Sequence, residues 1–245
     1  MNSLDRLAQV GLYRPDFEHD NCGFGLIAQI DGEASHKLVK TAINALARMT
    51  HRGAVAADGK SGDGCGLLLK KPVTFLRDKA KECGFDIGRN FCVGMVFLNP
   101  QEIRATRARV LFDKEINARG LTVNGWRTVP VNRDGCGREA QKSLPVIEQV
   151  YISAPPHMDV AEFNRNLFVA RRKTEIALRD EDPEFYVCSL SANVILYKGL
   201  MMPDRLPEFY PDLNDPTLAS RIAVFHQRFS TNTLPQWRLA QPFRY

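Results

Sequence analysis

The sequence contains no apolar run that approaches the roughly 20 residues needed to cross a bilayer, so we expect no membrane-spanning segment. It also lacks a block of like charges or a basic stripe with interleaved aromatics, which argues against nucleic-acid binding. The net charge of +5 could favour an anionic partner, but a solvated surface explains it more simply. With 245 residues, 44% of them hydrophobic, the chain can bury a sizeable globular core.

Residues 1–21 lack the apolar centre of a secretory signal peptide. Charged residues interrupt them at Asp5, Arg6, Arg14, Asp16, Glu18 and Asp20. We therefore expect a cytoplasmic protein. Two interpretations of residues 1–21 stay open, a frayed N-terminus or a pro-segment that ends at Asn21.

The six cysteines include no CxxC pair, so neither zinc nor iron–sulfur ligation has local support, and we expect no metal and no cofactor in this chain. The histidines that could join a metal site are scattered: His36, His51 and His226. A reducing compartment makes disulfides unexpected. Cys92 and Cys188 fall in apolar runs and are predicted to be small core residues, whereas Cys65 lies in a glycine loop and is ambiguous.

Cys22 has a different setting, in Asp20-Asn21-Cys22-Gly23-Phe24-Gly25 just before an apolar run. A cysteine beside glycine at the head of a strand is poorly placed to fill a core and well placed for a substrate to approach it. If residues 1–21 were removed, its own α-amine would lie next to its thiol. One residue would then supply both nucleophile and base.

Hydrophobic periodicity predicts alternating strands and helices, without a repeat or a flexible linker, and with the helices packed outside a sheet. The predicted strands are 23–30, 67–69, 92–98, 121–131, 146–153, 185–190, 193–197 and 221–225. The strands 185–190 and 193–197 are expected to form a pair with a tight connection. Residues 54–66 and 203–216 are predicted loops.

Cap residues predict where three helices begin and end. Ser35 caps a helix over 36–49, with Arg52 in its last turn and Gly53 just past it. Asn99-Pro100 begins a second helix, which Gly120 ends, and Asp159 begins a third as a capping box with Glu162. The expected apolar stripes are Val39, Ala42, Ile43, Leu46 and Met49; Ile103, Ala108, Leu111, Phe112 and Ile116; and Phe163, Leu167, Ala170 and Ala177, with Arg171-Arg172-Lys173 as a solvated face.

Two glycine patterns resemble phosphate-binding motifs but do not match them. Gly59-Lys60-Ser61 resembles the end of a P-loop, but Ala54 stands where that motif needs a glycine. Gly23 and Gly25 could open a dinucleotide fingerprint, but an apolar strand follows them instead of a helix. Neither pattern therefore supports nucleotide binding.

Arg228 follows a predicted strand and precedes Phe229-Ser230-Thr231-Asn232. A guanidinium held at a strand end can grip a carboxylate with two parallel hydrogen bonds. The neighbouring hydroxyl residues could orient a polar ligand. A structural ion pair is the alternative role for such an arginine.

Three motifs taken together resemble the N-terminal class II glutamine amidotransferase domain of glutamate synthase large (alpha) subunits. They are Asp20-Asn21-Cys22-Gly23-Phe24-Gly25-Leu26, His51-Arg52-Gly53 and His226-Gln227-Arg228-Phe229-Ser230-Thr231-Asn232-Thr233. The resemblance covers nearly the whole chain and includes Gly62-Asp63-Gly64-Cys65-Gly66 and Cys188-Ser189-Leu190. The long stretch between Cys22 and Arg228 favours this family over more compact amidotransferases.

The resemblance implies an α+β fold of the N-terminal-nucleophile (Ntn) hydrolase type, a four-layer αββα sandwich formed by residues 22–245 after a pro-segment of residues 1–21. It implies that Cys22 attacks the side-chain amide of L-glutamine and releases glutamate and ammonia through a thioester. Arg228 would bind the substrate α-carboxylate, with Phe229 and Thr231 lining the pocket. Arg52 and Gly53 would belong to the loop that supports the nucleophile.

The resemblance also implies partners outside this chain: the C-terminal remainder of the large subunit, with FMN and an iron–sulfur cluster, and a small electron-donating subunit. The family's oxyanion-hole Asn-Gly pair would follow Tyr245, so we expect a sandwich that is incomplete at its C-terminus. Because loss of one oxyanion donor typically costs a factor of about 10²–10³ in rate, we expect negligible glutaminase activity from these 245 residues alone. The alternative is a non-catalytic amidotransferase-like binding or interaction module.

Overall fold

The computed structural model describes residues 23–228 and 233–243. In this part of the chain the strands form two antiparallel sheets, ordered β1–β8–β2–β7 and β4–β5–β3–β6. The strands are β1 (Gly23–Ala28), β2 (Ser61–Lys70), β3 (Phe91–Leu98), β4 (Thr122–Thr128), β5 (Val146–Ser153), β6 (Tyr186–Ser189), β7 (Val194–Met201) and β8 (Ile222–Gln227). The predicted α+β class is confirmed.

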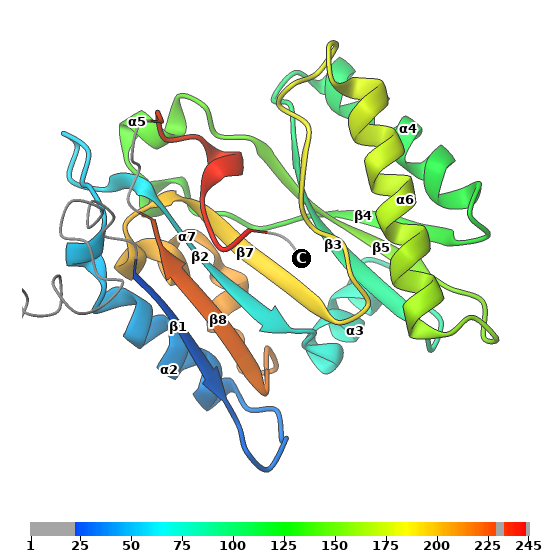
Figure 1. Cartoon of the computed structure of the whole chain (residues 1–245), viewed down its shortest axis with the longest axis horizontal. Helices are drawn as coiled ribbons and strands as arrows, with labels where there is room; N and C mark the ends of the chain where they lie inside the picture. The colour runs from blue at the N-terminus through cyan, green and yellow to red at the C-terminus, as the bar shows by residue number, and fades with distance from the viewer. Residues whose placement is uncertain (1–22, 229–232, 244–245) are drawn as a thin grey trace, which may run out of the picture.

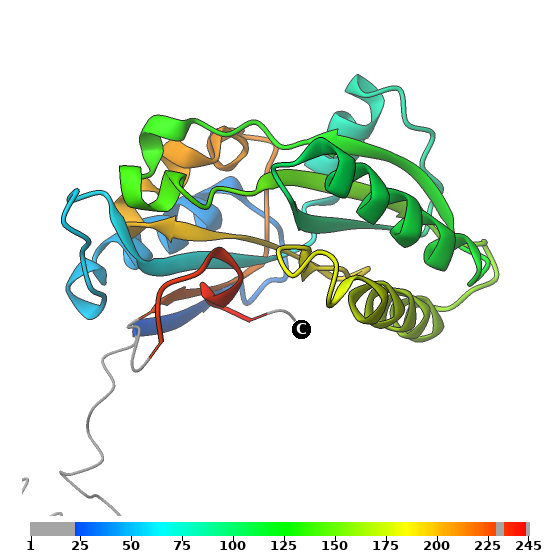
Figure 2. The ribbon, with the colours of Figure 1, turned by 90° about the horizontal axis from the view of Figure 1, so that it is seen from above.

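Helices lie against both sheets (Figure 1). The α-helices are α2 (His36–Ala47), α3 (Val73–Glu82), α4 (Glu102–Asn117), α5 (Arg138–Gln141), α6 (Val160–Leu178) and α7 (Leu206–Phe209). Helix α2 packs on β1 and β8, and the paired helices α4 and α6 cover the second sheet (Figure 2). None of the helices in the described ranges is long and apolar enough to cross a membrane.

Strand β1 pairs with β8 although the two lie at opposite ends of the sequence. Gly23 stands opposite Gln227, and Cys65 of β2 stands opposite Gln227 on the other side. Alternate residues of β1 point to opposite faces of the sheet. Phe24 and Leu26 are 77% and 64% exposed on one of these faces.

Helix α2 confirms the predicted start but ends earlier than expected. The Ser35 side chain accepts a hydrogen bond from the Leu38 amide, at 3.2 Å, and so caps the first turn. The helix ends at Ala47, and Thr50–Arg52 form a separate 3₁₀ turn, η2. The prediction that Arg52 and Gly53 end the helix was therefore wrong. Gly53 has an extended backbone with φ −136°.

Strand β3 divides the core into two clusters because its side chains alternate. Phe91, Val93, Met95 and Phe97 pack into a cluster that also contains the apolar face of α2. Cys92, Val96 and Leu98 pack under α4 and α6. Cys92 and Cys188 are fully buried, as predicted.

Two strand predictions were wrong. Residues 61–66, predicted to be loop, form the first half of β2, where the glycines lie against other backbone segments. Strands β6 and β7 do not pair with each other, since β6 pairs with β3 and β7 pairs with β2. Helix α3 was not predicted, although it buries Phe75, Leu76 and Ala80.

The helix patterns were partly correct. Asp159 caps α6 by accepting from the Glu162 amide at 2.7 Å, and Gly120 follows α4 with a φ of +69°. Helix α4 begins at Glu102 with Gln101 as its N-cap, so the predicted cap at Asn99 was wrong. Ile103 is 81% exposed, Ala177 is exposed and Arg171 is buried, all contrary to prediction.

Candidate active site

The structure describes three of the six predicted site residues: Arg52, Gly53 and Arg228. Cys22, Phe229 and Thr231 lie outside the described residues. Gly23 and Arg228, which adjoin Cys22 and Phe229 in the sequence, are described.

The ends of three strands meet at this site. Gly23, the residue after Cys22, pairs with Gln227, the residue before Arg228. The Arg228 amide donates to the Gly64 carbonyl oxygen at 2.9 Å, which joins the end of β8 to β2. The antiparallel register therefore brings together the two motifs that carry the predicted nucleophile and carboxylate clamp.

Arg228 is largely buried, with 8% of its surface exposed. Its Nη2 donates to the Thr233 hydroxyl at 2.6 Å. Its Nη1 is buried and has no hydrogen-bond acceptor in the described part of the chain. A buried guanidinium with an unused N–H edge suits an anionic ligand, because an unpaired buried donor is costly.

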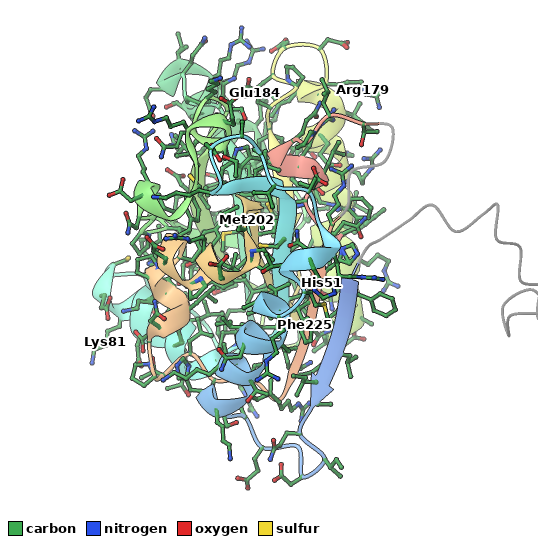
Figure 3. All side chains as sticks on the ribbon, turned by 90° about the vertical axis from the view of Figure 1, so that its left-hand side faces the viewer. His51, Lys81, Arg179, Glu184, Met202 and Phe225 are labelled. Carbon is green, nitrogen blue, oxygen red and sulfur yellow. The ribbon has the colours of Figure 1, made fainter. Side chains whose placement is uncertain are left out.

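Arg52 and Gly53 lie against the same strand ends. A Cβ on Gly23 would lie 3.2 Å from the Arg52 Cβ and 3.0 Å from the Met49 sulfur, so this turn packs on the residue next to Cys22. His51 lies in the same turn, η2, in Figure 3. The structure thus brings both predicted loop residues to the strand that begins at Gly23.

Gly53 is required by close packing. A Cβ at this position would lie 2.8 Å from the Arg228 carbonyl oxygen and would overlap the Gln227 side-chain amide. Gln227 is fully buried, and within the described residues its amide oxygen and nitrogen have no hydrogen-bond partner. Gly53 therefore sets how closely the η2 turn approaches the end of β8.

Burial controls the titration of two neighbouring groups. It lowers the pKa of His226, which favours the neutral imidazole. It also raises the pKa of the Cys65 thiol well above its usual range, with a smaller contribution from Asp204. Cys65 therefore stays protonated and is unsuited to act as a nucleophile.

Two buried polar residues were missed as site residues. Gln227 lies inside the His226–Thr233 motif, beside Arg228, but was given no role of its own. Asp63 is 6% exposed and accepts a hydrogen bond from the Ala54 amide at 3.2 Å, which ties the loop after Gly53 to β2. An acidic residue among glycines was its sequence signal. Within residues 23–228 and 233–243, His, Cys, Asp and Glu form no cluster of three that could hold a metal ion.

Known proteins are similar to this chain over nearly all of its residues. The family model for class-II glutamine amidotransferases matches residues 22–245. The NADPH glutamate synthase large chain of Azospirillum brasilense is 43% identical over 97% of this chain, and that of Bacillus subtilis is 42% identical over 96%. Ferredoxin-dependent glutamate synthase 2 of Synechocystis is 43% identical over 93%. The chain spans 16%, 16% and 14% of the lengths of these relatives.

Proposed function

Because the chain belongs to the class-II glutamine amidotransferase family, we propose that, together with the oxyanion-hole residues expected outside this chain, it releases ammonia from the side-chain amide of L-glutamine, with Cys22 as the nucleophile and Arg228 as the carboxylate clamp. The observation that carries this proposal is the pairing of Gly23 with Gln227. Cys22 immediately precedes Gly23, and Arg228 immediately follows Gln227, so each proposed functional residue is one position away from this pair in the sequence. The unused Nη1 of Arg228 supports the clamp.

The proposed chemistry requires removal of residues 1–21. The freed α-amine of Cys22, with an ordinary pKa of about 7.7–8.0, accepts the thiol proton near neutral pH. The sulfur attacks the amide carbon, and the tetrahedral intermediate expels ammonia, which carries that proton away. The resulting thioester is hydrolysed by water, which yields glutamate and restores the thiol.

The other predicted residues have supporting roles in this proposal. Phe229 and Thr231 line the glutamine pocket, since they directly follow Arg228. Arg52 and Gly53 support the strand that begins beside Cys22, and their packing on Gly23 and Gln227 agrees with that role. The assignment of residues 22–245 to the N-terminal part of an amidotransferase domain, incomplete at its C-terminus, belongs to the same proposal, with residues 1–21 as a pro-segment.

The names of the relatives favour a role in glutamate biosynthesis. We propose that the ammonia is passed to 2-oxoglutarate in a synthase region outside this chain, which holds FMN and an iron–sulfur cluster. Among the described residues, His, Cys, Asp and Glu form no group of three that could hold such a cluster. A small electron-donating subunit and a cytoplasmic location complete the proposal.

The clamp is tested by glutamine kinetics with Arg228→Lys, in the polypeptide as its gene encodes it. Lysine keeps the charge but loses the two-pronged geometry, so KM for glutamine should rise by about tenfold or more. Arg221→Lys, on an exposed arginine just before the same strand, should leave KM unchanged. An unchanged KM in Arg228→Lys would contradict the clamp.

Intact-mass measurement of the active protein tests the free-amine mechanism. The expected N-terminus is Cys22, and an active protein that retains residues 1–21 would exclude this mechanism. Labelling by a diazoketone analogue of glutamine separates catalysis from the binding-module alternative. A working site reacts at Cys22, whereas a non-catalytic module does not.

A further inference from the structure

Lys198 is a lysine of β7 with no exposed surface. Burying an ammonium group is costly unless acceptors replace the lost water. The Lys198 Nζ donates to the carbonyl oxygens of Arg238 and Ala240, both at 2.8 Å. The Tyr186 hydroxyl lies 3.4 Å away, and the Tyr186 ring centroid 4.6 Å away.

Both strong acceptors belong to the segment 236–241, which lies beside β2 and β7 in Figure 1 and Figure 2. This segment contains the 3₁₀ turn η6 (Trp237–Leu239). The Trp237 Nε1 donates to the Ala140 carbonyl at 3.1 Å, which gives the segment a second attachment. Lys198 therefore fixes the far end of the loop that begins at Arg228.

The two ends of that loop meet at Gly64 of β2. The Arg228 amide donates to the Gly64 carbonyl oxygen at 2.9 Å. On the other side, a Cβ at Gly64 would lie 2.7 Å from the Ala240 Cβ, so Ala240 packs directly on this glycine. Gly64 has a φ of +113°, a conformation that glycine adopts without strain.

We propose that Lys198 is a positioning residue for glutamine binding, which acts by fixing the far end of the loop that begins at Arg228. The inference rests on the proposed function, because Arg228 is the proposed carboxylate clamp. Lys198 itself donates to backbone carbonyl oxygens. Its charge strengthens both hydrogen bonds relative to neutral donors.

This role predicts that loss of the Lys198 ammonium weakens glutamine binding and leaves the reactivity of the Cys22 thiol unchanged. Loss of the ammonium would release Ala240 from Lys198 and let the loop spread from Gly64. The hydrogen bond from Arg228 Nη2 to Thr233 lies within the same loop, so the orientation of the clamp would change with it. Cys22 precedes Gly23, the first residue of a different strand, so its thiol should keep its intrinsic reactivity.

The test uses Lys198→Met, which keeps the side-chain length and removes the donors, in the polypeptide as its gene encodes it. Trp237→Phe removes the second attachment. Tyr210→Phe is the matched control, because it deletes a buried 2.8 Å hydrogen bond to the Lys198 carbonyl without touching residues 236–241. Each variant is labelled at Cys22 with a diazoketone analogue of glutamine and, separately, with iodoacetamide.

We expect Lys198→Met to slow diazoketone labelling by about tenfold or more, as loss of charged hydrogen bonds implies, while iodoacetamide labelling keeps the wild-type rate. Trp237→Phe should slow diazoketone labelling in the same direction, and Tyr210→Phe should slow neither reagent. Equal slowing of both reagents by Lys198→Met, or of neither, would overturn the positioning role.

Hydrogen exchange makes failure of the inference distinct from failure of the proposed function. Lys198→Met should speed exchange of the amides in residues 236–241, and Tyr210→Phe should not. If the wild-type protein is not labelled by the diazoketone, the proposed function is wrong. Unchanged exchange in Lys198→Met would reject the loop attachment in either case.

Discussion

Gly53 shows, at the scale of one residue, that packing at the site requires a residue without a side chain. The Gln227 amide and the Arg228 carbonyl occupy the space that a Cβ would fill. The backbone of Gly53 is extended, so the requirement is steric and does not arise from an unusual φ angle.

Gly53→Ala should destabilise the protein by about 1–3 kcal/mol, because overpacking forces backbone or side chains to shift. Since the shift falls on Gln227 and Arg228, glutamine KM should also rise. Urea unfolding and steady-state kinetics measure the two effects. Gly88→Ala is the matched control, because its Cβ would have nearest neighbours at 3.7 Å. Equal stability of the two variants would contradict the packing argument.

His226 should make stability sensitive to acid. Burial lowers its pKa in the folded protein, whereas the unfolded chain takes up the proton near the ordinary pKa of about 6.5. The unfolded state therefore binds more protons as pH falls, so this stabilisation is complete above about pH 6.5 and is lost below it.

His226→Gln should reduce the loss of unfolding free energy between pH 6.5 and about 5, measured by urea titration at several pH values. His157→Gln, at an exposed position, should retain the wild-type pH dependence. If the His226→Gln curve parallels that of the wild type, burial of His226 does not account for the acid sensitivity.

At the scale of elements, local sequence signals predicted the positions of strands and helix caps better than they predicted which strands pair. The apolar run 146–153 coincides with β5, and the polar caps at Ser35 and Asp159 mark the starts of their helices. Residues 61–66 look like a loop because glycine disfavours isolated strands. They belong to a strand that pairs with β7 and β8, and glycine is required because Met202, Ala240 and Gln241 lie too close for side chains at Gly62, Gly64 and Gly66. That closeness is a tertiary fact, absent from local sequence.

The site was predictable only where a residue type carried chemistry. Arg228 has the charge and geometry of a carboxylate ligand, so its motif could be identified from sequence. Gln227, Asp63 and Lys198 act through burial and contacts with distant backbone. An isolated lysine between Tyr197 and Gly199 in an apolar strand was the available signal for Lys198, since lysine is rarely buried without partners.

Asp58 connects two elements by hydrogen bonds. Burial opposes its charged form, but the amides of Glu139, Ser61 and Lys60 and the Ser61 hydroxyl outweigh that effect and hold its pKa well below the usual range. The Glu139 amide lies in α5, at 2.9 Å, so Asp58 fastens the loop before β2 to that helix. This stabilisation is present above the ordinary carboxyl pKa and is lost as pH falls.

Asp58→Asn should lower the free energy of unfolding at neutral pH by about 1–3 kcal/mol. The asparagine NH₂ group would replace one carboxylate oxygen and face N–H and O–H donors that need an acceptor. Urea unfolding at neutral pH measures the change, which should shrink in acid. Asp134 lines a surface pocket together with Asp58, and Asp134→Asn is the control, since the Asp134 side chain accepts no hydrogen bond among the described residues. Equal losses in the two variants would show that the Asp58 bonds are not stabilising.

At the scale of the whole molecule, a buried polar network joins the two sheets. Arg127 of β4 makes a two-pronged ion pair with Asp212, with both N–O distances 2.8 Å. Arg127 also donates to Gln149 of β5 at 2.8 Å, and the Gln149 amide bonds the Tyr197 hydroxyl of β7 at 3.3 Å. The sheets should therefore unfold together.

Arg127→Leu should cost about 3–5 kcal/mol, because it leaves the Asp212 carboxylate buried without its partner. The double variant with Asp212→Leu should lose less than the sum of the single variants. Thermal and urea unfolding measure this coupling. The exposed pair Lys142–Glu139 is the control, and Lys142→Leu should change stability little. Strictly additive losses would contradict a coupled pair.

The pairing of β1 with β8 also has a consequence for biosynthesis. A ribosome makes β1 among the first described residues, yet its hydrogen-bonding partner emerges only when Gln227 has been translated. While the residues between β1 and β8 are synthesised, the edge of β1 must wait without its neighbouring strand. We expect the nascent chain to depend on protection by chaperones until β8 leaves the exit tunnel. The pairing of β1 with β8 should be among the last strand pairings of its sheet to form.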